Sequence, residues 1–255
     1  MEKKILTYHD KIHVIENFIS PHTANLLTNL QNKFLSPTPH NKFIFGGLSG
    51  YAVSPIEYVS DYTGDPEFDL GLDLFQMIAT SMVEAVSLFY ETKFIAKSMF
   101  YSSMLPGAEN KLHMDNHYIS DDKTLKIREN EYSDRAALLY LNDAYTGGEL
   151  YFPLQDFEYK PPTGSLIFFE GDYTIPHGVK KVESGVRNNM ISFLYHERDK
   201  DRPRNRPMYE TEIEITEEMV LESLSKGISS DNGSNSGIKP WEGHLSRYQV
   251  NDIID

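Results

Sequence analysis

The sequence predicts an α+β protein, mainly β, in which an antiparallel double-sheet jelly roll packs against helices that come first in the chain. Helix start signals with amphipathic spacing fall in the first third of the sequence. Short apolar runs separated by glycine- and proline-containing turns then fill residues 94–197. Several short strands after a helical section are typical of this layered architecture.

The first third is predicted to form a helical support layer, residues 1–93. A capping residue followed by proline marks a helix start twice, at Ser20-Pro21 and at Asp65-Pro66. Apolar residues then recur at helical spacing as far as Phe34 in the first case and about Tyr90 in the second. The stretch between these helices, 45–63, is predicted as loops or short strands.

The jelly-roll core is predicted for residues 94–200. Its turns contain glycine pairs or prolines, as in Gly147-Gly148 and Pro161-Pro162. Strands are predicted at 96–105, 136–141, 150–152, 165–169, 179–182 and 189–195. Residues 1–200 are thus expected to be one domain. Residues 201–255 are expected to be a C-terminal extension with a flexible linker at 229–237, where every residue is Ser, Asp, Asn or Gly.

Composition excludes several function classes. The formal net charge of −14 argues against nucleic acid as a partner, because such proteins present a basic surface. The chain has no cysteine, so disulfides and thiolate chemistry are excluded and any metal must be bound by His, Asp or Glu. The first ten residues are too polar for a secretory signal, and no apolar run approaches the roughly 20 residues that span a bilayer. We therefore expect a cytoplasmic protein without a membrane partner.

The first candidate for chemistry is the pair His113 and Asp115. Ligand-type residues two apart point to the same side of an extended chain, so these two can share one metal ion. By itself the motif is common, and a polar surface loop is the alternative interpretation.

His177 provides the third candidate ligand. It lies between the apolar run 166–169 and the predicted strand 179–182, where we expect the mouth of the jelly roll. Two histidines and one carboxylate on one face of a metal leave three positions open, which is typical of non-haem iron(II) oxygenases. Zinc accepts the same donors, so a zinc-dependent hydrolase is an alternative from another class, with His117 as a possible extra ligand.

Arg187 indicates which co-substrate the metal site binds. If iron is chelated by a 2-oxo acid, the far carboxylate of that acid points into the barrel and needs a buried cation. Arginine binds a carboxylate bidentately and stays charged. Apolar residues follow Arg187 in its predicted strand, which favours a buried position. Tyr140 is either a second donor to the same carboxylate or an ordinary core tyrosine.

These motifs, taken together, resemble the catalytic domain of the prolyl 4-hydroxylases, a family of Fe(II)/2-oxoglutarate-dependent dioxygenases. The resemblance covers roughly residues 94–197, and its motifs occur in the family's order. It rests on His113-x-Asp115, Leu139-Tyr140-Leu141-Asn142-Asp143, the segment 147–153, Pro161-x-x-Gly164 with 165–169, His177-Gly178-Val179 and Gly185-x-Arg187.

The resemblance implies a double-stranded β-helix core, iron(II), 2-oxoglutarate and molecular oxygen, with ascorbate as a possible addition. It assigns His113, Asp115 and His177 as the iron ligands and Arg187 as the 2-oxoglutarate anchor. Collagen-type members have lysine at that anchor, whereas arginine is similar to the oxygen-sensing prolyl hydroxylases. Tyr101 resembles the tyrosine that lines the co-substrate pocket. The implied reaction hydroxylates an unactivated carbon and releases succinate and CO₂.

The sequence leaves alternatives open for the identity of the substrate. The resemblance indicates a prolyl residue of a peptide or protein, yet related domains hydroxylate free amino acids and other small molecules. Two further rivals are a catalytically inactive binding module and a nucleic-acid demethylase, and the acidic charge disfavours the second. The charged segment 116–133 follows the first two ligands, so we expect it to be a substrate-contacting lid. The oligomeric state is left open.

Overall fold

The computed structural model describes residues 4–35, 42–45, 48–119, 125–127 and 133–199. Within these residues the larger sheet has eight strands, and neighbouring strands in it are antiparallel. In spatial order they are β1 (Lys4–His9), β2 (Ile12–Glu16), β13 (Leu166–Glu170), β9 (Arg135–Tyr140), β16 (Arg187–His196), β5 (Phe94–Met104), β4 (Leu48–Val53) and β3 (Lys42–Phe45). Segments far apart in the sequence therefore lie side by side.

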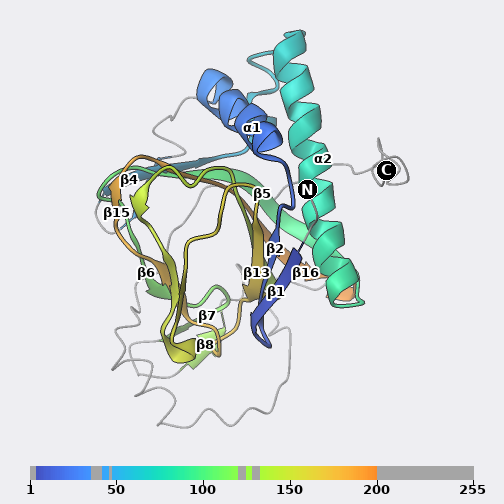
Figure 1. The fold of residues 1–255 in the computed structure, drawn as a ribbon. Helices are drawn as coiled ribbons and strands as arrows, with labels where there is room; N and C mark the ends of the chain where they lie inside the picture. The colour runs from blue at the N-terminus through green and yellow to red at the C-terminus, as the bar shows by residue number, and fades with distance from the viewer. Residues whose placement is uncertain (1–3, 36–41, 46–47, 120–124, 128–132, 200–255) are drawn as a thin grey trace.

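A smaller sheet faces the larger one across the interior of the barrel (Figure 1). In spatial order, its strands are β12 (Phe157–Tyr159), β11 (Leu150–Phe152), β14 (His177–Val179) and β6 (Asn110–His113). Buried side chains of both sheets, such as Leu138 of β9 and Phe152 of β11, form one cluster between them. The predicted mainly β architecture with a jelly-roll core is confirmed.

Two further strand pairs complete the β structure of the described residues. They are β10 (Thr146–Gly147) with β15 (Val182–Ser184), and β7 (His117–Ile119) with β8 (Leu125–Ile127). Short 3-10 helices lie at Pro55–Tyr58, Pro153–Gln155 and Glu197–Asp199.

Both predicted helices form, and they lie together on one side of the sheets (Figure 1). Helix α1 spans Pro21–Phe34, and the Ser20 hydroxyl accepts a hydrogen bond from the Thr23 backbone N–H. Helix α2 spans Pro66–Phe89, and its cap Asp65 accepts from two backbone N–H groups of the first turn. The capping signals therefore predicted both helix starts correctly.

Helix α2 is long and apolar enough to cross a membrane when only length and composition are considered, although no such segment is expected from the sequence. Its buried residues, among them Phe75, Met82 and Val86, pack in one cluster with Leu139 and Phe168 from the outer face of the larger sheet. This packing is what a core helix of an α+β domain requires.

The first 93 residues supply strands β1 to β4 as well as the two helices, so this segment builds the larger sheet in addition to supporting it. Most predicted core strands form within two residues of their expected bounds. The predicted strand 179–182 is wrong. The chain turns there, because β14 ends at Val179 in the smaller sheet and β15 begins at Val182 against β10.

The predicted lid, residues 116–133, contains β7 and β8, which form a hairpin. Residues 120–124 and 128–132 of this segment, and the predicted extension 201–255, lie outside the described residues. The lid and the extension stay predictions.

Candidate metal centre

The smaller sheet brings the three candidate ligands together. His113 ends β6, His177 begins β14, and these two residues are paired in register. The ligand atoms of His113, Asp115 and His177 all lie within 4.8 Å of one another. Nε2 of His113 is 3.6 Å from Asp115 Oδ1, and Nε2 of His177 is 3.7 Å from the same oxygen. These separations exceed a hydrogen bond and suit atoms that share one ion.

Backbone carbonyls orient both imidazole rings. Nδ1 of His113 lies 2.7 Å from the Lys111 carbonyl oxygen, and Nδ1 of His177 lies 3.1 Å from that of Ile175. A carbonyl only accepts, so each Nδ1 carries the proton and each Nε2 presents its lone pair to the site. Metal-binding histidines use their second nitrogen in this way.

Burial sets the charge of the His177 ring. The residue is 5% exposed, and this burial lowers its pKa from 6.5 to about 4, against the opposing effect of the Ile175 carbonyl. The ring is neutral at neutral pH, which is the form that binds a metal. Phe169 and Phe152 pack near it, with ring centroids 4.5 Å and 5.9 Å from that of His177.

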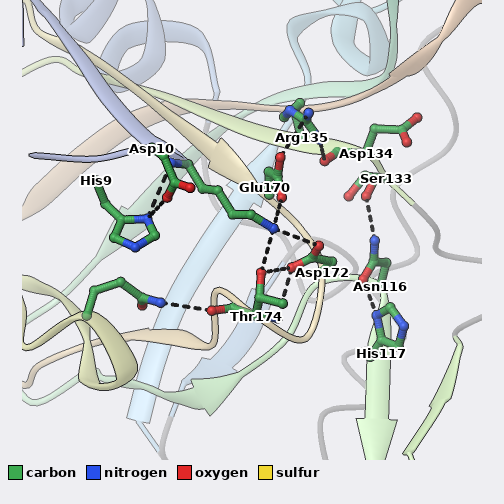
Figure 2. Close-up of polar contacts among 12 residues, drawn as sticks. His9, Asp10, Asn116, His117, Ser133, Asp134, Arg135, Glu170, Asp172 and Thr174 are labelled. Atoms are coloured by element: carbon green, nitrogen blue, oxygen red, sulfur yellow. Dashed lines mark hydrogen bonds and ion pairs between the residues drawn. The ribbon is translucent and has the colours of Figure 1, made fainter. Parts of the chain in front are cut away.

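The backbone beside Asp115 is held by a close contact between two loops. The Asn116 N–H donates to the Gly171 carbonyl at 3.0 Å, and the Asn116 side-chain amide donates to the Ser133 carbonyl at 3.0 Å (Figure 2). A Cβ atom on Gly171 would lie 2.8 Å from the Ser133 carbonyl oxygen and 3.3 Å from Asp115 Cβ. Glycine at position 171 therefore permits the carboxylate to sit where it does.

A polar network holds the loop that delivers His177. Glu170, Asp172 and Thr174 gather there in Figure 2. Lys11, from the turn between β1 and β2, places its ammonium nitrogen 2.6 Å from Glu170 Oε2 and 3.0 Å from Thr174 Oγ1. Arg135 contacts the other Glu170 oxygen at 3.2 Å. The loop is thus tied to both the N-terminal hairpin and β9.

Arg187 lies in the interior with 1% exposure. Its Nη2 donates to the Tyr140 hydroxyl at 2.5 Å, and Nη1 contacts Met104 sulfur at 3.4 Å. Nε has no hydrogen-bond partner in the described part of the chain, and no described acidic side chain forms an ion pair with this arginine. A buried guanidinium without a carboxylate is costly, so the site is suited to an anionic ligand.

Burial keeps the neighbouring phenols protonated. It raises the pKa of Tyr140, and the charge of Arg187 only partly offsets this. Tyr145, which sequence reasoning missed, is also buried, and Arg187 is the main charge that acts on its hydroxyl. Its position two residues before the Gly147-Gly148 turn was the available signal. A Cβ on Gly148 would lie 3.0 Å from the Tyr145 ring and 3.3 Å from Arg187 Cδ.

Tyr101 does not join this pocket. It is fully buried, but its ring packs 5.1 Å from Phe75 of α2 and belongs to the cluster between helices and sheet. Tyr140 belongs to the cluster inside the barrel. The two tyrosines thus lie on opposite faces of the larger sheet, and the predicted pocket role of Tyr101 has no support in the geometry.

His117 also stays outside the ligand group, which among the described residues contains His113, Asp115 and His177. Its Nδ1 lies 2.5 Å from Asn116 Oδ1, and its ring meets the edge of Tyr173. The three donors of this group, two imidazoles and one carboxylate, fit iron(II).

Comparison with known proteins agrees with this site. Residues 99–195 match the model of the 2OG-Fe(II) oxygenase superfamily, in agreement with the resemblance that the sequence motifs indicate. Prolyl 3-hydroxylase 2 of Rattus norvegicus is 31% identical over 125 residues, covering 43% of this chain and 18% of the relative. Prolyl 3-hydroxylase 1 of Gallus gallus is 31% identical over 86 residues, covering 31% of this chain and 12% of the relative. The chain thus spans less than a fifth of the length of each of these two relatives.

A solved structure shares the fold. It is a prolyl hydroxylase from Trichoplax adhaerens in complex with a peptide fragment of the hypoxia inducible factor oxygen degradation domain. The alignment has a TM-score of 0.53 and 16% identity, and it covers 74% of this chain and 86% of that chain.

Proposed function

We propose that this 2-oxoglutarate-dependent dioxygenase, whose residues 99–195 match the 2OG-Fe(II) oxygenase superfamily, hydroxylates a prolyl residue of a peptide or protein. The co-substrate would leave as succinate and CO₂. The alternative within the same chemistry is hydroxylation of a free amino acid or another small molecule.

In this proposal His113, Asp115 and His177 hold iron(II), which when bound supplies oxygen activation coupled to decarboxylation of 2-oxoglutarate. The residues around the ligands fix their orientation. The carbonyls of Lys111 and Ile175 keep both Nε2 lone pairs toward the site. The rings of Phe169 and Phe152 limit water beside His177.

The observation that carries the proposal is Arg187, buried in the same interior as the ligands, with Tyr140 beside it and no acidic partner among the described residues. A diacid anchored there by its far carboxylate completes the missing ion pair. A zinc-dependent hydrolase gives this arginine no role, which disfavours that reading of the three ligands.

The choice of a prolyl substrate is supported by the curated relatives, which are prolyl hydroxylases, and by the fold neighbour that was solved with a peptide. The relatives are 3-hydroxylases, whereas the sequence motifs resemble 4-hydroxylases. The position of the hydroxyl group on the ring is therefore a result for the experiment to supply.

The test is a succinate-release assay of the purified protein with iron(II), ascorbate and 2-oxoglutarate, screened across proline-containing peptides and free amino acids. We expect peptide-dependent succinate release and a product heavier by one oxygen atom in mass spectrometry. His113→Ala should abolish turnover, whereas His22→Ala, at an exposed position of α1, should not change it. Turnover that persists in His113→Ala would refute the site, and hydroxylation of free amino acids alone would select the alternative.

A further inference from the structure

Asn189 is a fully buried polar residue of β16. It has 0% exposure, and neither its amide nitrogen nor its amide oxygen has a hydrogen-bond partner in the described part of the chain. Buried amides in native proteins are nearly always paired, because an unmet donor or acceptor keeps the full cost of leaving water. A buried amide without a protein partner is therefore suited to form hydrogen bonds with a bound ligand.

The side chain of Asn189 faces the interior of the barrel. Residues 187, 189, 191 and 193 of β16 alternate along the strand and share one face. Ile191 and Phe193 of this set pack against the interior cluster. Asn189 is paired in register with Tyr140, whose hydroxyl accepts a hydrogen bond from Arg187.

Along that face, Asn189 lies between the arginine and the metal site. Phe193 is paired with Ala136, which is paired with Phe169, and the Phe169 ring lies 4.5 Å from that of His177. On the inward face of β16, Phe193 therefore lies at the end close to the metal ligands, and Arg187 lies at the opposite end. Asn189 is the first inward residue after Arg187 in the direction of the metal.

On the basis of the proposed function, we infer that Asn189 is a further co-substrate-binding residue. Its amide N–H donates a hydrogen bond to the far carboxylate of 2-oxoglutarate, beside the donors Arg187 and Tyr140. A carboxylate offers about four acceptor positions, so three donors can bind it together. The amide then discriminates 2-oxo diacids from 2-oxo monoacids.

Binding without turnover tests this inference. 2-Oxoglutarate is titrated by calorimetry into protein loaded with Mn(II) instead of iron. Asn189→Ala should weaken binding about tenfold or more, as expected for a lost hydrogen bond to a charged group. Asn189→Asp, which keeps the shape but adds a negative charge, should weaken it further. 2-Oxobutyrate, which lacks the far carboxylate, should bind the wild type and Asn189→Ala equally.

Asn188→Ala is the matched control. This neighbour faces the other side of the sheet, where its Oδ1 accepts from the Ser103 hydroxyl at 2.7 Å. It should bind 2-oxoglutarate within about twofold of the wild type, and thermal melts should show that each variant is folded. If Asn189→Ala does not fold, Asn189→Ser, which keeps a donor, replaces it and should lose less affinity than Asn189→Asp.

Wild-type affinity for 2-oxoglutarate in Asn189→Ala would overturn the inference and leave the proposed function standing. An equal loss for 2-oxobutyrate would also overturn it. Failure of the wild type itself to bind 2-oxoglutarate would instead overturn the proposed function, and the inference with it.

Discussion

Replacing Arg187 by methionine and Tyr140 by phenylalanine together should raise the stability of the protein and weaken co-substrate binding. The guanidinium is buried, with Tyr140 as its hydrogen-bond partner and no carboxylate among the described residues. Replacement of buried ionic groups by well-packed apolar side chains of similar volume is often neutral or stabilises proteins by about 1–4 kcal/mol. The single substitution leaves the Tyr140 hydroxyl without its donor, at a cost of about 1–3 kcal/mol.

The single variant should therefore have nearly unchanged stability, and the double variant Arg187→Met/Tyr140→Phe should gain about 1–4 kcal/mol. A chain of this size shifts its Tm by about 2–4 °C for each kcal/mol. Loss of a buried charged partner costs about 2–5 kcal/mol in binding, so both variants should bind 2-oxoglutarate about 30-fold to several-thousand-fold more weakly.

Scanning calorimetry of the metal-free protein and titration of 2-oxoglutarate into the Mn(II)-loaded protein measure the two effects. Arg135→Met is the control, because Arg135 has a carboxylate partner in Glu170 at 3.2 Å and its removal should destabilise the protein. A large loss of stability in the Arg187/Tyr140 double variant, or 2-oxoglutarate affinity that survives in it, would contradict the reasoning.

Other predictions concern the supports of the site. Gly171→Ala should displace Asp115 and weaken metal binding about 10- to 100-fold in a Mn(II) titration. Lys11→Met should release the Glu170 loop and weaken metal binding while the circular dichroism spectrum stays unchanged. Burial lowers the pKa of His13, so protonation opposes folding and stability should fall as the pH drops below 6.5. His13→Phe should reduce that loss, as measured by urea unfolding at pH 5 and 7.5.

The sequence was sufficient for features that depend on local chemistry. Ser20 and Asp65 predicted the starts of the two helices, because a capping side chain accepts hydrogen bonds from the backbone N–H groups in the first turn of the helix that follows it. His113 and Asp115 could be assigned to one site because residues two apart on an extended chain share a side. Arg187 could be expected inside the barrel because apolar residues follow it.

The sequence was insufficient for features that depend on which face of a strand a residue occupies. Tyr101 and Tyr140 are both buried strand tyrosines, and a register difference of one residue decides whether such a ring faces α2 or the barrel. The role of Asn189 could not be predicted from the sequence, because the absence of hydrogen-bond partners for an asparagine side chain can be seen only when its spatial neighbours are known. Short strands such as β10 carry too few residues for any periodicity.

The central claim is that iron(II) and 2-oxoglutarate bind together at His113, Asp115 and His177. Anaerobic titration of 2-oxoglutarate into the iron(II)-loaded protein tests it directly, because chelation of iron(II) by the 2-oxo acid gives a visible charge-transfer absorption. We predict an absorption that saturates at one equivalent, requires iron and is lost in His177→Ala. Absence of this absorption in the wild type, or its persistence in His177→Ala, would contradict the account.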